Sequence, residues 1–128
     1  MEQPSPILVL VTLQRACARL IRHGTDLALK QHCPLHVLHV MVNPEQADPA
    51  HAMDAHALDY LYALSGEAGA QMTVLTADVA VTAIAEFATQ QGARQVILGD
   101  GEHAGGIAET LAALLPGVQV MIVDPENS

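Results

Sequence analysis

The chain has 128 residues, a formal net charge of −9 and a hydrophobic fraction of 51%, with two Tyr, one Phe and no Trp. This composition is typical of one folded domain, residues 1–128, with a single sizeable core, and it excludes a disordered chain. It also argues against nucleic acid as a partner, because phosphate backbones need clustered Lys and Arg and single strands need aromatic stacking platforms.

The cysteines and the first residues indicate the compartment. Cys17 and Cys33 lie too far apart for a CxxC motif, so we expect reduced thiols. The opening residues, MEQPSP, resemble no signal peptide, and the longest apolar runs fall well short of the roughly 18 residues that span a bilayer. We therefore expect an acidic cytoplasmic protein with no membrane insertion.

The first third of the chain alternates between strand and helix patterns. Residues 7–11, ILVLV, are continuously apolar, which predicts a central parallel strand covered on both faces. Apolar residues then recur at helical spacing over residues 14–30, and the polar side of this predicted helix carries Arg15, Arg19 and Arg22. Residues 35–42 predict a second strand.

The alternation continues to the end of the chain. Asp78 is a candidate N-cap, and Gly92 suits the left-handed position after a helix. The remaining predicted elements are, in order, a turn-rich loop at 43–49, a helix at 52–65 that ends near Gly66 and Gly69, a strand at 72–75, a helix at 79–91, a strand from 95, a helix that ends near 115, and a strand at 118–123.

Strands that alternate with helices predict the α/β class. Right-handed crossovers then give a Rossmann-like, doubly wound parallel five-stranded sheet with helices on both faces. In such sheets, ligands bind at the carboxyl ends of the strands, where the winding direction reverses. The glycine-rich stretch from Gly99 to Gly106 follows the fourth strand and opens a helix, whose free N–H groups favour an anion.

At this point the chain resembles the universal stress protein family, and within it most closely the stress-protein-like segment of potassium-sensing histidine kinases. The residues that carry this likeness are 7–12, 19–22, 34–40, 69–75, 83–88, 96–99 and 105–123. The resemblance implies strand order 3-2-1-4-5 and a homodimer formed through the last strand, Val118 to Val123. It also implies ATP binding by two features. One is an acidic residue after the first strand, and the other is a glycine pattern after the fourth strand that consists of Gly-x-x-Gly, a longer loop, and then Gly-Ser or Gly-Thr.

The sequence departs from the family pattern at each nucleotide-binding position. Thr12 stands where the acidic residue belongs, Gly99 matches the first glycine, and Glu102 replaces the second. The loop is shorter, and Gly105-Gly106 replaces Gly-Ser. A shorter loop offers fewer N–H groups to a triphosphate, and acidic residues beside it repel phosphate.

Two readings of this crevice follow. The preferred one is a non-enzymatic stress-response or signalling domain whose degenerate nucleotide crevice serves a regulatory protein partner or weak ligand sensing, with no certain cofactor. The alternative is a nucleotide-binding switch that takes ATP, ADP or a cyclic dinucleotide. Its candidate ligand contacts are Thr12, Arg15, Val42, Gly99, Gly101, Gly105 and Gly106.

Catalysis and metal binding find little support in the sequence. No nucleophile elbow, Ser/His/Asp signature or P-loop lysine motif occurs, so we expect no catalytic residues, although a small hydrolase or transferase with an unrecognised site remains a third hypothesis. His36 and His39 are three residues apart on a predicted strand, so they should point to opposite faces of the sheet. The sequence contains no HExxH motif and no Cys/His cluster, so it predicts no metal site. Arg15, Arg19 and Arg22 could receive an acidic or phosphorylated ligand, or simply form a solvated helix face.

Overall fold

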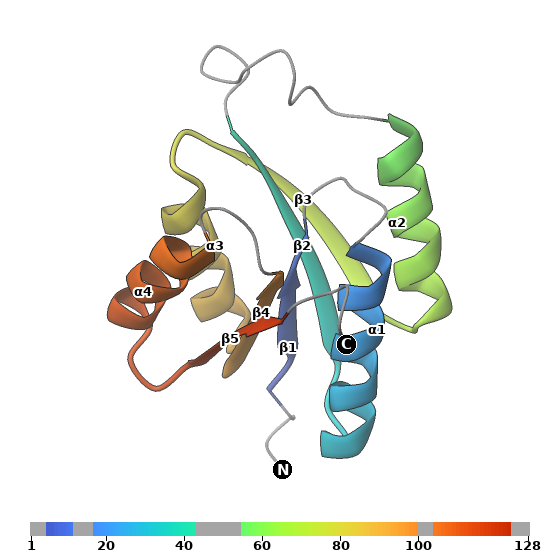
Figure 1. Ribbon diagram of the computed structural model, residues 1–128, viewed down its shortest axis with the longest axis horizontal. Helices are drawn as coiled ribbons and strands as arrows, with labels where there is room; N and C mark the ends of the chain where they lie inside the picture. The colour runs from blue at the N-terminus through green and yellow to red at the C-terminus, as the bar shows by residue number, and fades with distance from the viewer. Residues whose placement is uncertain (1–4, 12–16, 43–54, 100–103, 124–128) are drawn as a thin grey trace.

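The computed structural model describes residues 5–11, 17–42, 55–99 and 104–123 (Figure 1). Five strands and four helices alternate along this part of the chain. They are β1 (Ile7–Leu10), α1 (Cys17–Gln31), β2 (Leu35–Val42), α2 (Ala55–Glu67), β3 (Gln71–Ala77), α3 (Ala80–Gln91), β4 (Gln95–Gly99), α4 (Ala104–Leu114) and β5 (Gln119–Val123). All the strand pairings are parallel and the order is β3-β2-β1-β4-β5, which confirms the predicted α/β architecture.

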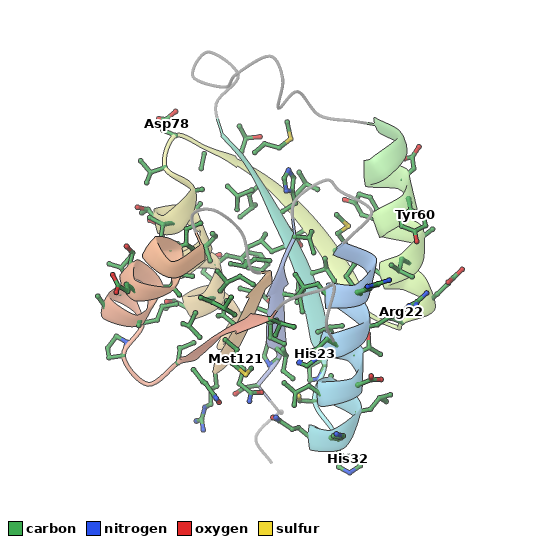
Figure 2. The ribbon with its side chains drawn as sticks, viewed as in Figure 1. Arg22, His23, His32, Tyr60, Asp78 and Met121 are labelled. Carbon is green, nitrogen blue, oxygen red and sulfur yellow. The ribbon has the colours of Figure 1, made fainter. Side chains whose placement is uncertain are left out.

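Element boundaries differ from the predictions at several ends. The third strand is longer than expected, because it pairs with β2 along its whole length from Gln71 to Ala77. The prediction of Asp78 as the N-cap of α3 is wrong, because Val79 occupies that position with extended backbone angles, φ −125° and ψ 111°. The helix start has no capping hydrogen bond from a side chain of this residue. Asp78 lies before it, in the turn between β3 and α3 (Figure 2). Gly92 does end α3 in the left-handed conformation, with φ 68°.

The sheet is covered by two helices on each side, as Figure 1 shows. α1 and α2 pack on one face around a cluster that includes Val9, Leu20 and Ile97. α3 and α4 pack on the other face around Leu8, Phe87 and Leu111. We call these the α1–α2 face and the α3–α4 face. β1 contributes to both clusters, and its residues 7–9 are at most 1% exposed, so the continuous apolar run at 7–11 reflects burial from both sides.

The closest approach between a helix and the sheet occurs at Gly24, in the middle of α1. A Cβ atom at this position would lie 2.6 Å from Val9 Cγ2 and 3.0 Å from Leu35 Cδ1. Both neighbours are buried, so neither side chain has room to move away. Glycine is therefore required here by packing, since its lack of a side chain lets α1 lie directly on β1 and β2.

His36 is the polar exception on the α3–α4 face. Its side chain is 7% exposed, its Nε2 lies 2.7 Å from Thr73 Oγ1, and its ring meets Phe87 edge-on with centroids 4.9 Å apart. His39, three residues on, instead contacts the residue after β1. It shares its side of β2 with Val37, which packs in the α1–α2 cluster, so the two rings lie on opposite faces, as predicted. Burial lowers the pKa of His36 below its ordinary value of 6.5, because the apolar surroundings disfavour the charged ring.

We predict that Gly24→Ala destabilises the fold by about 1–3 kcal/mol, because the new methyl group overpacks the contact between α1 and β1. Gly66→Ala is the matched control. Gly66 also lies in a helix, but a Cβ there has nothing within 4 Å, so we expect no loss of stability. Urea unfolding of the two variants checks this, and equal midpoints would contradict the packing role of Gly24.

His36 should make the fold sensitive to acid. Because the folded pKa lies below that of the unfolded chain, unfolding takes up a proton. The stability from neutral His36 is therefore complete above about pH 6.5 and is lost as the pH falls through the folded pKa. We expect His36→Gln, which retains hydrogen-bonding capacity toward Thr73, to flatten this loss. Unfolding free energies measured from pH 8 to pH 5 compare the two proteins, and parallel curves would contradict the assignment to His36.

Candidate functional site

The winding of the sheet reverses between β1 and β4. The chain passes from β1 to β2 on one side, whereas β4 pairs with β1 on the other, so Leu10 lies between Leu38 and Leu98. This reversal point is where open α/β sheets bind ligands, at the carboxyl ends of the strands. Gly99 follows Leu98 directly, and it therefore lies beside the end of β1. The topology thus brings one predicted site residue, Gly99, to the expected crevice.

The start of α4 brings two further predicted residues to the same edge of the sheet. Gly105 and Gly106 lie in its first turn and are exposed. The backbone N–H groups of a helical first turn have no partner within the helix, so they can donate to an anion. The net dipole of the helix favours negative charge at this end.

These glycines differ from Gly24 in that packing does not require them. Among the described residues, a Cβ at Gly105 or Gly106 would have no atom within 4 Å, and one at Gly99 would make only an ordinary 3.5 Å contact with Leu20 Cδ2. Glycine inside a helix costs up to about 1 kcal/mol relative to alanine. Two adjacent glycines with open space above them therefore leave the backbone accessible at a cost in helix stability.

The other predicted site residues are less closely grouped or lie outside the described residues. Val42 ends β2, four positions beyond Leu38, which is level with the end of β1. At about 3.3 Å per residue, β2 extends roughly 13 Å past that level, so Val42 is not beside Gly99. Thr12, Arg15 and Gly101 lie outside the described residues.

One residue at this edge was not among the predicted site residues. His39 Nδ1 lies 2.9 Å from the carbonyl oxygen of Val11, the residue before Thr12. A carbonyl only accepts, so Nδ1 carries the proton and donates it. His39 therefore holds the end of β1 in place from the neighbouring strand. Strand alternation placed it on the face opposite His36, but only the parallel register with β1 places it at the crevice.

The basic side of α1 is exposed in the structure. Arg19 and Arg22 lie in the first half of the helix, which begins at the carboxyl edge of the sheet. Arg22 and Tyr60 lie on the neighbouring helices α1 and α2, on the side of the molecule away from α3 and α4 (Figure 2). Lys30 lies in the last turn of α1, about 20 Å along the axis from its start.

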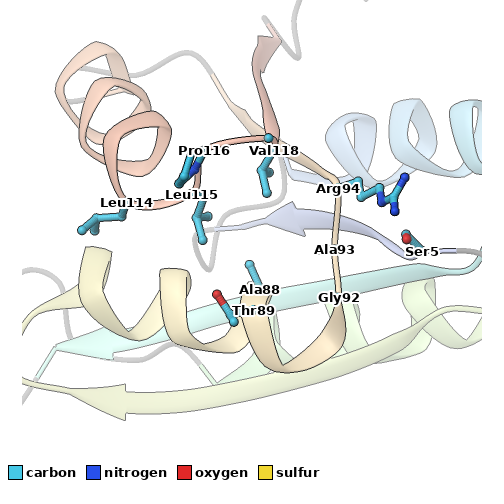
Figure 3. A pocket seen from close by; sticks show the side chains of 11 residues that line it. Ser5, Ala88, Thr89, Gly92, Ala93, Arg94, Leu114, Leu115, Pro116 and Val118 are labelled. Carbon is cyan, nitrogen blue, oxygen red and sulfur yellow. The ribbon is translucent and has the colours of Figure 1, made fainter.

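Three grooves that described residues line lie away from this crevice. The largest, about 800 Å³, is at the amino-terminal edge, where Leu115 and Val118 face Ala88 and Thr89 across the gap between the α4–β5 connection and α3 (Figure 3). A second lies between α3 and α4, beside Glu86 and Leu114. A third, about 450 Å³, is at the amino ends of β2 and β3.

The described residues offer neither a metal cluster nor a membrane-spanning helix. Within the described ranges, no three His, Cys, Asp or Glu residues gather in a way that could hold a metal ion. None of the described helices is both long enough and apolar enough to cross a membrane.

Comparison with solved structures confirms the architecture. The fold is similar to universal stress protein UspA from Lactobacillus plantarum, with a TM-score of 0.73, 17% identity and coverage of 96% of this chain and 99% of that one. It is also similar to a universal stress protein from Archaeoglobus fulgidus, with a TM-score of 0.72, 17% identity and 95% coverage of each chain.

A third similar structure is that of the universal stress protein from Archaeoglobus fulgidus in complex with dAMP, with a TM-score of 0.68, 19% identity and coverage of 96% and 98%. A search of curated proteins finds no match to this sequence. The model of the universal stress protein family, however, matches residues 5–114, which is most of the chain, from the residues before β1 to the end of α4. This protein therefore belongs to the universal stress protein family.

Proposed function

We propose that this protein is a non-enzymatic, cytoplasmic stress-response and signalling domain whose crevice senses a nucleotide weakly. The observation that carries the proposal is the exposed first turn of α4, which contains Gly105 and Gly106 and follows β4 at the carboxyl edge of the sheet. Structures similar to this one include complexes with dAMP, cAMP and AMP. The family membership supports a role in stress adaptation.

The chemistry of the crevice favours a nucleotide with one phosphate group. One helix turn supplies only a few N–H donors, and the sequence between Gly99 and α4 adds Asp100 and Glu102. Each phosphate beyond the first increases the repulsion from these carboxylates in a chain of net charge −9. A switch driven by ATP is the second candidate, favoured by the glycines that remain from the family pattern.

The placement of the basic residues supports a role without catalysis. Lys30 is the only lysine in the sequence, and it lies in the last turn of α1, at the end away from the crevice. Phosphoryl transfer needs cations at the transferred group. Arg19 and Arg22, closer to the crevice, instead offer an exposed basic surface to an acidic regulatory partner.

The edge strand β5 is the surface that we propose for the homodimer. Residues 119–123 carry no charge, β5 pairs with β4 alone, and Ile122 is 44% exposed. An apolar edge without charges or proline is prone to pair with another strand. The likeness to the stress-protein-like segment of potassium-sensing histidine kinases further suggests that such a dimer works together with a signalling protein.

We expect AMP to bind with a Kd on the order of 100 μM, and ATP with magnesium to bind at least about tenfold more weakly because of charge repulsion. Isothermal titration with AMP, cAMP and ATP measures this. Gly106→Val should weaken AMP binding about tenfold or more by blocking access to the N–H groups, whereas Gly66→Val, an exposed helical glycine away from the crevice, should leave it unchanged.

The outcomes of this titration distinguish the two candidate functions. Tighter binding of ATP than of AMP would favour the ATP switch and contradict the preference for a single phosphate. No heat with millimolar nucleotide would contradict nucleotide sensing altogether. Thermal unfolding of both glycine variants serves as the folding control.

Introducing charge on β5 should separate the dimer. We predict that Ile122→Lys converts the protein to a monomer at tens of micromolar protein, because a buried unpaired ammonium opposes edge pairing. Leu114→Lys is the matched control, since Leu114 is 50% exposed but lies at the end of α4. Sedimentation velocity compares the variants with the parent protein, and a monomeric parent would refute the dimer.

A further inference from the structure

The cavity at the amino ends of β2 and β3 lies at the opposite edge of the sheet from the crevice. Its volume of about 450 Å³ falls within the range of small-molecule sites. Its polar lining consists of Ser5, His36, Gln71 and Gln91, and its apolar lining includes Pro6 and Pro34. No charged side chain of the described residues lines it.

His36 forms the most constrained part of this cavity. Thr73 is the only hydrogen-bond partner of its ring among the described residues, and it engages Nε2. In the described part of the chain, no fully enclosed side-chain nitrogen or oxygen lacks a hydrogen-bond partner. Since Nδ1 has no such partner, it must touch open space, and the cavity is the open space that His36 lines. His36 is 7% exposed as a whole residue, and one of its ring nitrogens is thus engaged by no described residue.

The hydrogen-bonding capacity of the lining points to a ligand that both donates and accepts. The hydroxyl of Thr73 can donate to Nε2 or accept from it, so Nδ1 is free to take the complementary role. The carboxamides of Gln71 and Gln91 each offer a donor and an acceptor. A carboxamide on the ligand can form hydrogen bonds with all of these groups, because it carries both donors and an acceptor.

The described lining residues carry no formal charge near pH 7, which disfavours charged ligands. An anion would meet no cation, and a cation would meet no carboxylate, among the described lining residues. Burial also keeps His36 in its neutral form near pH 7, because the charged ring is poorly solvated there. Desolvating an unpaired charge in such a site is unfavourable. Pro6, Pro34 and Leu35 supply apolar surface for the flat part of a ligand.

We propose that this cavity is a second binding site, separate from the nucleotide crevice, that takes an uncharged planar amide through His36, Gln71 and Gln91. The ligand carboxamide lies against the imidazole and the two glutamines, and its ring lies against the prolines. This site does not depend on nucleotide binding, because its residues come from the amino ends of the strands and the end of α3.

Three probes of equal shape and different charge test the ligand class. Benzamide is neutral, benzoate is an anion and benzamidinium is a cation. Long-range proton–nitrogen NMR spectra report the ring nitrogens of His36, identified by the signal that His36→Gln removes. We expect benzamide to shift the Nδ1 signal with half-saturation on the order of 1 mM, and the two ions to shift it at least about tenfold less at the same concentration.

Two adjacent glutamines provide a matched pair of variants. Gln91 lines this cavity, whereas Gln90 lines the groove between α3 and α4 instead. Both are exposed, so neither substitution should disturb folding. Gln91→Ala should weaken benzamide binding about fivefold, as expected for one lost hydrogen bond, and Gln90→Ala should leave it unchanged.

Three results would overturn the proposal: no shift of His36 with benzamide at 20 mM, equal shifts with benzoate or benzamidinium, or equal weakening by Gln90→Ala and Gln91→Ala. Saturating AMP should not displace benzamide, since the two sites lie at opposite edges of the sheet. A failure of AMP binding would leave the benzamide result unaffected, so the two proposals fail independently.

Discussion

The burial of β1 on both faces is the constraint on which the rest of this structure depends. Its residues 7–9 are almost fully enclosed, so the strand needs a neighbour on each side and helices above and below. Only its carboxyl end can meet a ligand, because every other part of it is covered. The hydrogen bond from His39 to the carbonyl of Val11 fixes that end. The site is therefore where the most buried strand leaves the core.

The glycines of this chain serve distinct physical roles. Gly24 is required because α1 lies too close to Val9 and Leu35 for any side chain. Gly92 is required by its left-handed backbone at the end of α3. Neither reason applies to Gly105 and Gly106, which have open space above them. Gly66 also lacks both constraints, so access by a ligand is indicated by the position of Gly105 and Gly106 in the first turn of α4.

His36 and His39 both belong to β2, but they lie toward opposite edges and on opposite faces of the sheet. His36 lies near the amino end, on the α3–α4 face, against Thr73 and Phe87. His39 lies on the other face and contacts the last residue described before the β1–α1 connection. A spacing of three residues on a strand separates the rings by face and by about 10 Å along the chain. Two histidines that look like a pair in the sequence thus belong to different sites.

The class of the fold and the order of its elements could be predicted from the sequence. The continuous apolar run at 7–11 predicted a strand covered on both faces, and residues 35–42 predicted a second strand. Helical spacing predicted α1 and α3, and Gly92 predicted the end of α3. These features are local, so the pattern of nearby residues is sufficient. The length of β3 and the start of α3 were decided by pairing with β2, which holds the chain extended through Ala77 and moves the N-cap to Val79. Three features could be seen only in the folded structure: the packing requirement at Gly24 that Gly105 lacks, the contact of His39 with Val11, and the cavity next to His36. Each depends on atoms that lie far apart along the chain.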